Sequence, residues 1–268
     1  MQWSLVGSEM CIRDSIQGGI ELTYEGPFAG ALPDPEKNLV LQAAQMFRRK
    51  MRVKPQDVLL TLHKHMPVTS GIGSGSADAA AALRLFARFW KVEAVAVQLP
   101  SIAASLGADV PACLHAQPLW MEGIGDIITS LLRMPRISML LVNPGEAVAT
   151  AEVFAAWDGQ ATEPMKCPDA FDDVETLLPF LRKTENQLQG TAIHICPAIG
   201  DVLALLEKQS GCKLARMSGS GATCFGIFRR QGATEQAAES IQRVQPGWWV
   251  KPVMTIAMAE TDRARWYG

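Results

Sequence analysis

A glycine-rich turn followed directly by a long run of helix-forming residues constrains this chain more than any other feature. Three glycines alternate with other small or apolar residues at Gly71, Gly73 and Gly75, and alanine and leucine dominate residues 79–90. Glycine permits positive φ and lets a ligand reach the backbone without meeting a Cβ. A helix that starts after such a turn points several N–H groups, and the positive end of its dipole, at one spot. The pattern predicts an anion site, and phosphate is the usual anion.

Two better-known phosphate loops do not match this turn. A Walker A loop ends in Lys followed by Ser or Thr, and no such pair follows Gly75. The dinucleotide-binding fingerprint has the spacing G-x-G-x-x-G, whereas the glycines here alternate. For a Gly/Ser-rich stretch taken alone, a flexible surface turn that binds nothing is the alternative interpretation. Other parts of the sequence have to decide between the two.

Composition excludes several classes of protein. With 268 residues, the chain can bury a core and form two modest domains. Its net charge of −2 carries no basic signature of nucleic-acid binding. No apolar run reaches the roughly 18–20 residues that span a bilayer, and no signal peptide is evident. The six cysteines lack any CxxC or Cys/His metal spacing, which indicates reduced thiols in a cytoplasmic protein and no metal site.

The chain mixes strand and helix patterns without a strict βαβ repeat, which predicts an α+β protein. Alternating or short apolar runs predict strands at 20–24, 58–64, 139–142, 212–217, 224–228 and 248–253, and a hairpin at 120–128. Helical spacing predicts helices at 39–47, 79–90, 102–106, 150–157, 174–181, 199–208 and 235–244. Asn38 is the expected N-cap of the first helix. Pro111 is expected to discourage helix at Val110.

Three blocks in this order resemble one family, the GHMP small-molecule kinases (galactose, homoserine, mevalonate and phosphomevalonate kinases). They are the glycine-rich turn at residues 67–77, the segment LGADVP at 106–111, and a second glycine turn at 218–226. The resemblance covers roughly residues 16–253. It implies a two-domain α+β fold, with a first domain like ribosomal protein S5 domain 2 and a ferredoxin-like second domain. A boundary near Met134-Pro135 then gives domains of residues 1–135 and 136–268.

The resemblance implies an ATP-dependent kinase that phosphorylates an alcohol, with Mg²⁺ bridging the phosphates. The LGADVP wording is typical of one branch, as are Asn143-Pro144-Gly145 and residues 184–188. That branch phosphorylates the 2-hydroxyl of a 4-diphosphocytidyl branched polyol in non-mevalonate isoprenoid biosynthesis. Alternatives are a homoserine- or mevalonate-type acceptor, a nucleotide-binding protein with little activity, and a purely structural domain. We expect a cytoplasmic monomer or homodimer with no nucleic-acid or membrane partner.

Individual residues take roles from the resemblance. Asp109 matches the catalytic base, and the alternative is a capping or turn Asp before Pro111. Asn38 and Lys64 match positions at the adenine end of the nucleotide, and exposed surface positions are the alternative for both. The nucleotide's phosphates would be held by Pro67, Val68, Thr69, Ser70, Gly71, Ile72, Gly73, Ser74, Gly75, Ser76 and Ala77. Ser74 and Ser76 would present hydroxyls to phosphate or Mg²⁺, and helix capping is their other interpretation.

The acceptor side is assigned in the same way. Thr150 and Phe154 match positions on that side, and four residues apart on a helix they would face the same way. Phe154 would stack on the cytosine ring, whereas ordinary core packing is its alternative. Gly219 and Gly221 would let the second glycine turn press against the phosphate loop, unless they form a plain hairpin turn.

Residues 1–15 fit the family least. Members begin with a strand of the pattern Pro-Ala-Lys-hydrophobic-Asn and continue with Asp-Gly-Tyr-His, and neither occurs here. We expect residues 1–15 to be non-native sequence, and turnover to be strongly impaired without the family's Lys beside the base. The sequence leaves open how the missing edge strand is compensated, since an unpaired neighbour would be exposed and prone to association. Finding these fifteen residues encoded in frame at the native locus would contradict the first expectation.

Overall fold

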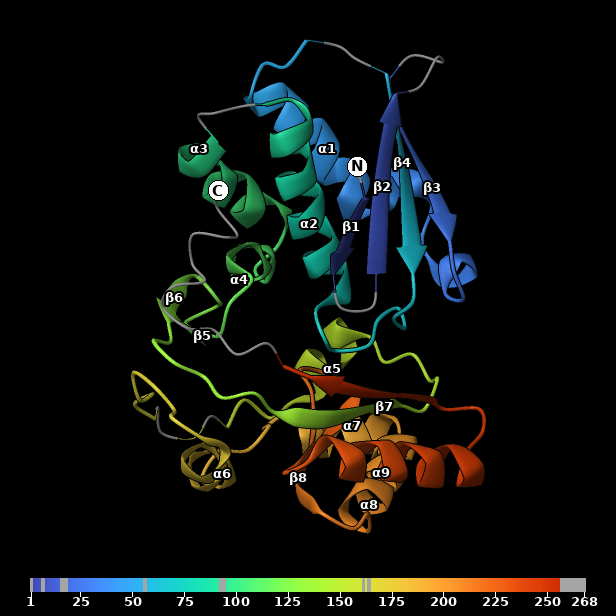
Figure 1. Cartoon of the computed structure of the whole chain (residues 1–268), viewed down its shortest axis with the longest axis vertical. Helices are drawn as coiled ribbons and strands as arrows, with labels where there is room; N and C mark the ends of the chain where they lie inside the picture. The colour runs from blue at the N-terminus through green and yellow to red at the C-terminus, as the bar shows by residue number, and fades with distance from the viewer. Residues whose placement is uncertain are drawn as a thin grey trace. The chain divides into compact units, whose positions relative to one another are not determined.

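The computed structural model describes residues 2–5, 8–14, 19–54, 57–91, 95–160, 162 and 165–255. The chain forms two compact units, Met1–Val68 with Gly73–Thr129, and Thr69–Ile72 with Ser130–Gly268. Each unit has its own sheet and its own buried core (Figure 1). Strands and helices mix as the α+β prediction requires. None of the helices in the described ranges combines the length and apolarity that crossing a bilayer demands.

The sheet of the first unit has four strands in the order β1-β2-β4-β3. Their bounds are β1 Gln2–Leu5, β2 Ser8–Asp14, β3 Ile20–Glu25 and β4 Val58–Lys64. Strand β2 is antiparallel to β4 and β3 is parallel to it, so both edges of β4 are paired. The structure answers the question that the sequence left open, because residues 8–14 supply the neighbour on this edge of β4. The non-native origin of residues 1–15 stays a prediction.

The helices of the first unit lie beside this sheet, with α1 and α2 together on one face (Figure 1). The helices are α1 Leu39–Lys50, α2 Ser74–Phe89, α3 Val95–Leu106 and α4 Val110–His115, with short 3₁₀ turns at Ala29–Ala31 and Pro35–Lys37. Helix α1 begins where predicted, because Asn38 Oδ1 accepts a hydrogen bond from the N–H of Val40 at 2.9 Å. The prediction at Val110 is wrong. Helix α4 starts there because Pro111 lies in its first turn, where no N–H is needed.

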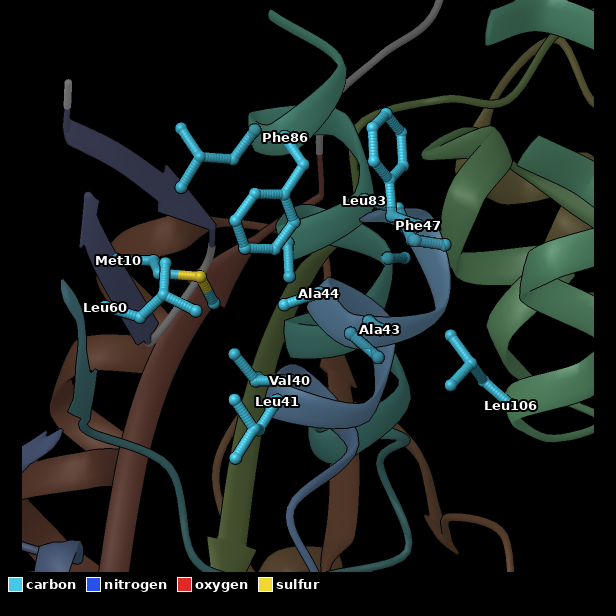
Figure 2. Packing of buried hydrophobic residues seen from close by; sticks show 14 of the residues in the cluster. Met10, Val40, Leu41, Ala43, Ala44, Phe47, Leu60, Leu83, Phe86 and Leu106 are labelled. Carbon is cyan, nitrogen blue, oxygen red and sulfur yellow. The ribbon is translucent and has the colours of Figure 1, made fainter. Parts of the chain in front are cut away.

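The core of the first unit fixes how α2 is held. Figure 2 shows Val40 and Phe47 of α1 packed in one cluster with Leu83 and Phe86 of α2, and all four are fully buried. Phe86 also stacks on Trp90 at the end of α2, with ring centroids 4.9 Å apart. Alanines on the buried face of α2 let the two helices approach closely. The start of α2 is thereby set by packing along its length and not by the glycine turn alone.

The second unit is built on an antiparallel sheet in the order β10-β7-β9-β8. The strands are β7 Ser138–Asn143, β8 Cys212–Met217, β9 Cys224–Phe228 and β10 Trp249–Met254. The helices are α5 Thr150–Ala156, α6 Val174–Arg182, α7 Gln189–Ile195, α8 Ala198–Glu207 and α9 Gln231–Val244. The succession β7, α8, β8, β9, α9, β10 is the split βαβ arrangement of ferredoxin-like folds, which confirms the prediction for this unit.

A short hairpin connects the end of α4 to the second unit along the chain. It pairs β5 Leu119–Glu122 with β6 Ile127–Ser130, as the sequence predicted for residues 120–128. Helical spacing in the sequence did not predict α7. It predicted that α3 begins at Ile102, whereas the helix begins at Val95.

Candidate active site

The glycine-rich turn leaves the start of α2 open to an anion. Gly73 is the N-cap in the left-handed conformation, with φ 64° and ψ 22°, and no side chain caps the helix. The first helical hydrogen bond runs from the N–H of Ala77 to the carbonyl of Gly73 at 2.9 Å. The N–H groups at Ser74, Gly75 and Ser76 therefore have no capping side chain, the arrangement that binds phosphate. The capping interpretation of the two serines is wrong, because the cap position belongs to Gly73.

A buried ion pair closes the base of this turn. Lys64, the last residue of β4, places its Nζ 2.5 Å from Oδ2 of Asp78, which lies in α2. Lys64 is 1% exposed and Asp78 is 3% exposed. Asn38 is also buried, so the interpretation of Asn38 and Lys64 as exposed surface residues is wrong. Asp78 had no predicted role, although a lone carboxylate within a run of alanines on a buried helix face indicates a buried partner.

The second glycine turn, residues 218–223, presses against the first part of the phosphate loop, as predicted. Both segments belong to the second unit. Ser218 Oγ donates to the carbonyl of Gly71 at 3.0 Å, and the N–H of Thr223 donates to the carbonyl of Ser70 at 3.2 Å. A Cβ on Gly71 would lie 2.5 Å from the carbonyl oxygens of Gly221 and Ser218. Only glycine at position 71 allows this approach.

Two amide side chains hold the second glycine turn in shape. Asn186 donates from Nδ2 to the carbonyls of Met217 and Gly219, at 2.9 and 2.8 Å. Asn143 donates from Nδ2 to Oγ1 of Thr223 at 2.9 Å. Both asparagines lie in segments that carried the resemblance, but no sequence pattern predicted a role in the site for either of them.

Asp109 occupies the N-cap position of α4, and its exposed carboxylate makes no capping hydrogen bond. The interpretation of Asp109 as a capping residue is therefore not supported. Helix α4 packs against α2 within the first unit (Figure 1). The pKa of the nearby Cys113 thiol is raised to about 11, first by burial and then by the Asp109 carboxylate, against the lowering effect of the Arg84 guanidinium. Cys113 therefore stays a neutral thiol at ordinary pH.

The two acceptor-side candidates lie on α5 of the second unit. Phe154 is 55% exposed, so its interpretation as a core residue is wrong, while the adjacent Val153 is buried. Thr150 Oγ1 lies 2.8 Å from Oγ of Ser220, which ties α5 to the second glycine turn. The i,i+4 spacing places Thr150 and Phe154 on the same side of the helix, as predicted.

The family is decided by comparison with known proteins. The description GHMP kinases N terminal domain matches residues 38–117, and GHMP kinases C terminal matches residues 171–247. A 4-diphosphocytidyl-2-C-methyl-D-erythritol kinase of Cereibacter sphaeroides (strain ATCC 17029 / ATH 2.4.9) is 44% identical over 249 residues, which cover 91% of this chain and 86% of the relative. This chain belongs to the GHMP kinases. A kinase of the same name from Chelativorans sp. (strain BNC1) is 42% identical over 233 residues, which cover 87% of this GHMP kinase and 79% of the relative.

Solved structures agree with this assignment. The crystal structure of a 4-(cytidine 5'-diphospho)-2C-methyl-D-erythritol kinase matches with a TM-score of 0.72 and 26% identity, covering 93% of this chain and 86% of that one. A homoserine kinase from Cytophaga hutchinsonii also reaches a TM-score of 0.72, over 96% of this chain and 88% of that one, but at 17% identity it shows the fold alone. This GHMP kinase is thus an ATP-dependent small-molecule kinase with the two-domain fold that the resemblance implied.

Proposed function

We propose that this GHMP kinase transfers the γ-phosphoryl group of ATP to the 2-hydroxyl of 4-diphosphocytidyl-2-C-methyl-D-erythritol, a step of non-mevalonate isoprenoid biosynthesis. The observation that carries the proposal is sequence identity of 41–45% to relatives of that name over most of the chain. A homoserine- or mevalonate-type acceptor has less support. A homoserine kinase of known structure is 17% identical to this chain and a mevalonate kinase is 11% identical.

The residues of the phosphate loop fit a nucleoside triphosphate. The uncapped start of α2 offers backbone N–H groups to an anion. Among the described residues, the hydroxyl of Ser70 is buried without a hydrogen-bond partner, and a phosphate oxygen would supply one. The described residues contain no group of three or more His, Cys, Asp or Glu side chains that could hold a metal by itself. Mg²⁺ would therefore arrive with the ATP phosphates, beside the hydroxyls of Ser74 and Ser76, and supply charge neutralisation there.

Asp109 is the proposed base of the transfer. The acceptor hydroxyl oxygen forms a bond to the γ-phosphorus, the bond between that phosphorus and the β,γ-bridging oxygen breaks, ADP leaves, and the hydroxyl proton passes to the Asp109 carboxylate. Positioning and charge stabilisation do most of the work in such a reaction. No covalent enzyme intermediate is required.

The nucleoside ends of the two substrates would be held elsewhere. Asn38 and Lys64 would line the adenine end of ATP. Because the Lys64 ammonium is buried against Asp78, it would contribute its main chain and its stem instead of a free charge. The exposed ring of Phe154 would stack on cytosine, with Thr150 on the same side of α5.

A turnover assay tests the proposal directly. ATP would be supplied with the cytidylyl substrate, homoserine or mevalonate, to this chain and to a version in which residues 1–15 are replaced by a family-like start. We expect turnover with the cytidylyl substrate only, higher in the repaired chain, and thermal stabilisation by CDP. Faster turnover of either other alcohol would overturn the proposed acceptor.

A carboxylate replacement tests the base. Asp109→Asn should lower kcat by about 10²–10⁴-fold, the usual contribution of a general base, with ATP affinity nearly unchanged. Glu21→Gln removes an exposed carboxylate from β3 and is the matched control. An Asp109→Asn enzyme with normal kcat would exclude Asp109 as the base.

A further inference from the structure

We propose that Arg84 is a positioning residue for Asp109, acting through the far end of α4. The inference rests on the proposed function, because it concerns the residue proposed there as the base. Neither the motifs nor the comparisons give Arg84 a role. Its side chain comes from the middle of α2, the helix whose start forms the phosphate site.

Arg84 forms two hydrogen bonds to the last turn of α4, which together are called the clamp. Nη1 of Arg84 donates to two main-chain carbonyls, those of Cys113 and Leu114, at 3.0 Å each. The last carbonyls of a helix have no partner within the helix and carry its partial negative charge. A guanidinium placed there satisfies both carbonyls and opposes that charge.

The position of the clamp matters because α4 is short. The helix has six residues, so it is about 9 Å long. Asp109 stands at its first end and the clamped carbonyls stand in its last turn. A helix of this length has little stability of its own, and it ends at Ala116 in a left-handed conformation with φ 49°. Fixing the last turn therefore fixes the direction in which α4 presents Asp109.

The clamp joins α4 to the helix that starts at the phosphate site. Buried Val110 and Leu114 hold the side of α4 against the core, and the Arg84 hydrogen bonds set its rotation and tilt. Without them α4 could pivot on its apolar contacts. A misplacement of about 1 Å in a reacting group can lower the rate of a reaction about 10²-fold.

The test is a double-mutant cycle in the full chain, with kcat measured on ATP and the cytidylyl substrate. Arg84→Met should lower kcat about 10–100-fold while KM for ATP changes little, because the start of α2 is unaltered. Arg84→Lys, which keeps a charged donor, should recover part of kcat. Arg88→Met removes the same charge from the next turn of α2 and should leave kcat within about twofold.

The cycle with Asp109 distinguishes positioning from a general structural effect. In an Asp109→Asn background, adding Arg84→Met should lower kcat by less than about twofold, because the group that Arg84 positions is already disabled. An equal loss in both backgrounds, or a loss that appears in KM for ATP, would overturn the inference. If Arg84→Met does not fold, the same cycle run with Arg84→Lys gives the same decision. Normal kcat for Asp109→Asn alone would instead count against the proposed function.

Discussion

The buried pair between Lys64 and Asp78 makes the sharpest stability prediction. Asp78→Ala removes the carboxylate and leaves the Lys64 ammonium in a site where its side chain is 2% exposed. A buried charge that has lost its partner is far more costly than the pair was favourable. We therefore expect the first unit to be strongly destabilised, although the substitution introduces alanine, a good helix former, into α2.

The magnitude follows from the burial of both side chains. Breaking a buried pair by removing one partner costs about 3–5 kcal/mol. For a chain of this size, 1 kcal/mol shifts the melting temperature by about 2–4 °C, so the expected fall is about 6–20 °C. Asp78→Asn should lose less, because the amide oxygen can still accept a hydrogen bond from the ammonium.

The double replacement Lys64→Met with Asp78→Leu is the matched control. It removes both charges and refills the site with apolar groups of similar volume, so it should recover most of the loss. The measurement is thermal and urea unfolding by circular dichroism. A loss below about 1 kcal/mol for Asp78→Ala, the size typical of an exposed pair, would refute the reasoning. So would a double variant no more stable than Asp78→Ala.

The remaining predictions use other contacts of the site. Gly71→Ala should lower the melting temperature and abolish stabilisation by the nucleotide, because the added Cβ would lie 2.5 Å from two carbonyl oxygens. Gly75→Ala is the control: a Cβ there meets no atom within 4 Å, so the melting temperature should stay unchanged or rise. Phe154→Ala should leave folding intact and eliminate stabilisation by CDP in a thermal-shift assay, since the ring is exposed. Asn186→Ala should cost about 1–3 kcal/mol in urea unfolding, since the carbonyl of buried Met217 and the exposed carbonyl of Gly219 both lose their donor. The pKa of Cys113 is raised to about 11 in the folded protein. The neutral thiol therefore contributes its full stability below about pH 9, where the unfolded thiol is also protonated, and this contribution is lost as pH rises toward 11. Cys113→Ser should reduce that loss when the free energy of unfolding is measured against pH.

Local patterns in the sequence predicted the elements that local physics decides. Asn38 caps α1 because its side chain needs only the N–H two residues along the chain. Strands β8 and β9 begin and end at the predicted residues, because apolar runs and glycine turns delimit both. The error at Val110 came from the rule that the residue before a proline avoids the helical conformation, which does not hold at this helix start, where Pro111 lies in the first turn.

Partners that are distant along the chain could not be predicted in this way. The pairing of Lys64 with Asp78, and the donation from Arg84 to residues 113 and 114, depend on how α2 packs against β4 and α4. The exposure of Phe154 likewise depends on which face of α5 the second unit buries. A pattern can identify residue types that suit a site, but only packing decides which of them meet.

Contacts within the chain or a positive φ explain why two positions of the phosphate loop are glycine, but they do not explain the third. Gly71 lets two carbonyls approach its Cα, and Gly73 holds the left-handed cap of α2. Gly75 has neither reason. It lies in the first turn of a helix, its φ is not positive, and a Cβ there would meet nothing within 4 Å. Glycine in a helix costs about 1 kcal/mol relative to alanine. A residue that costs stability and relieves no contact within the chain is accounted for if a ligand approaches its backbone. The N–H of Gly75 is one of the uncapped N–H groups at the start of α2 that suit a phosphate.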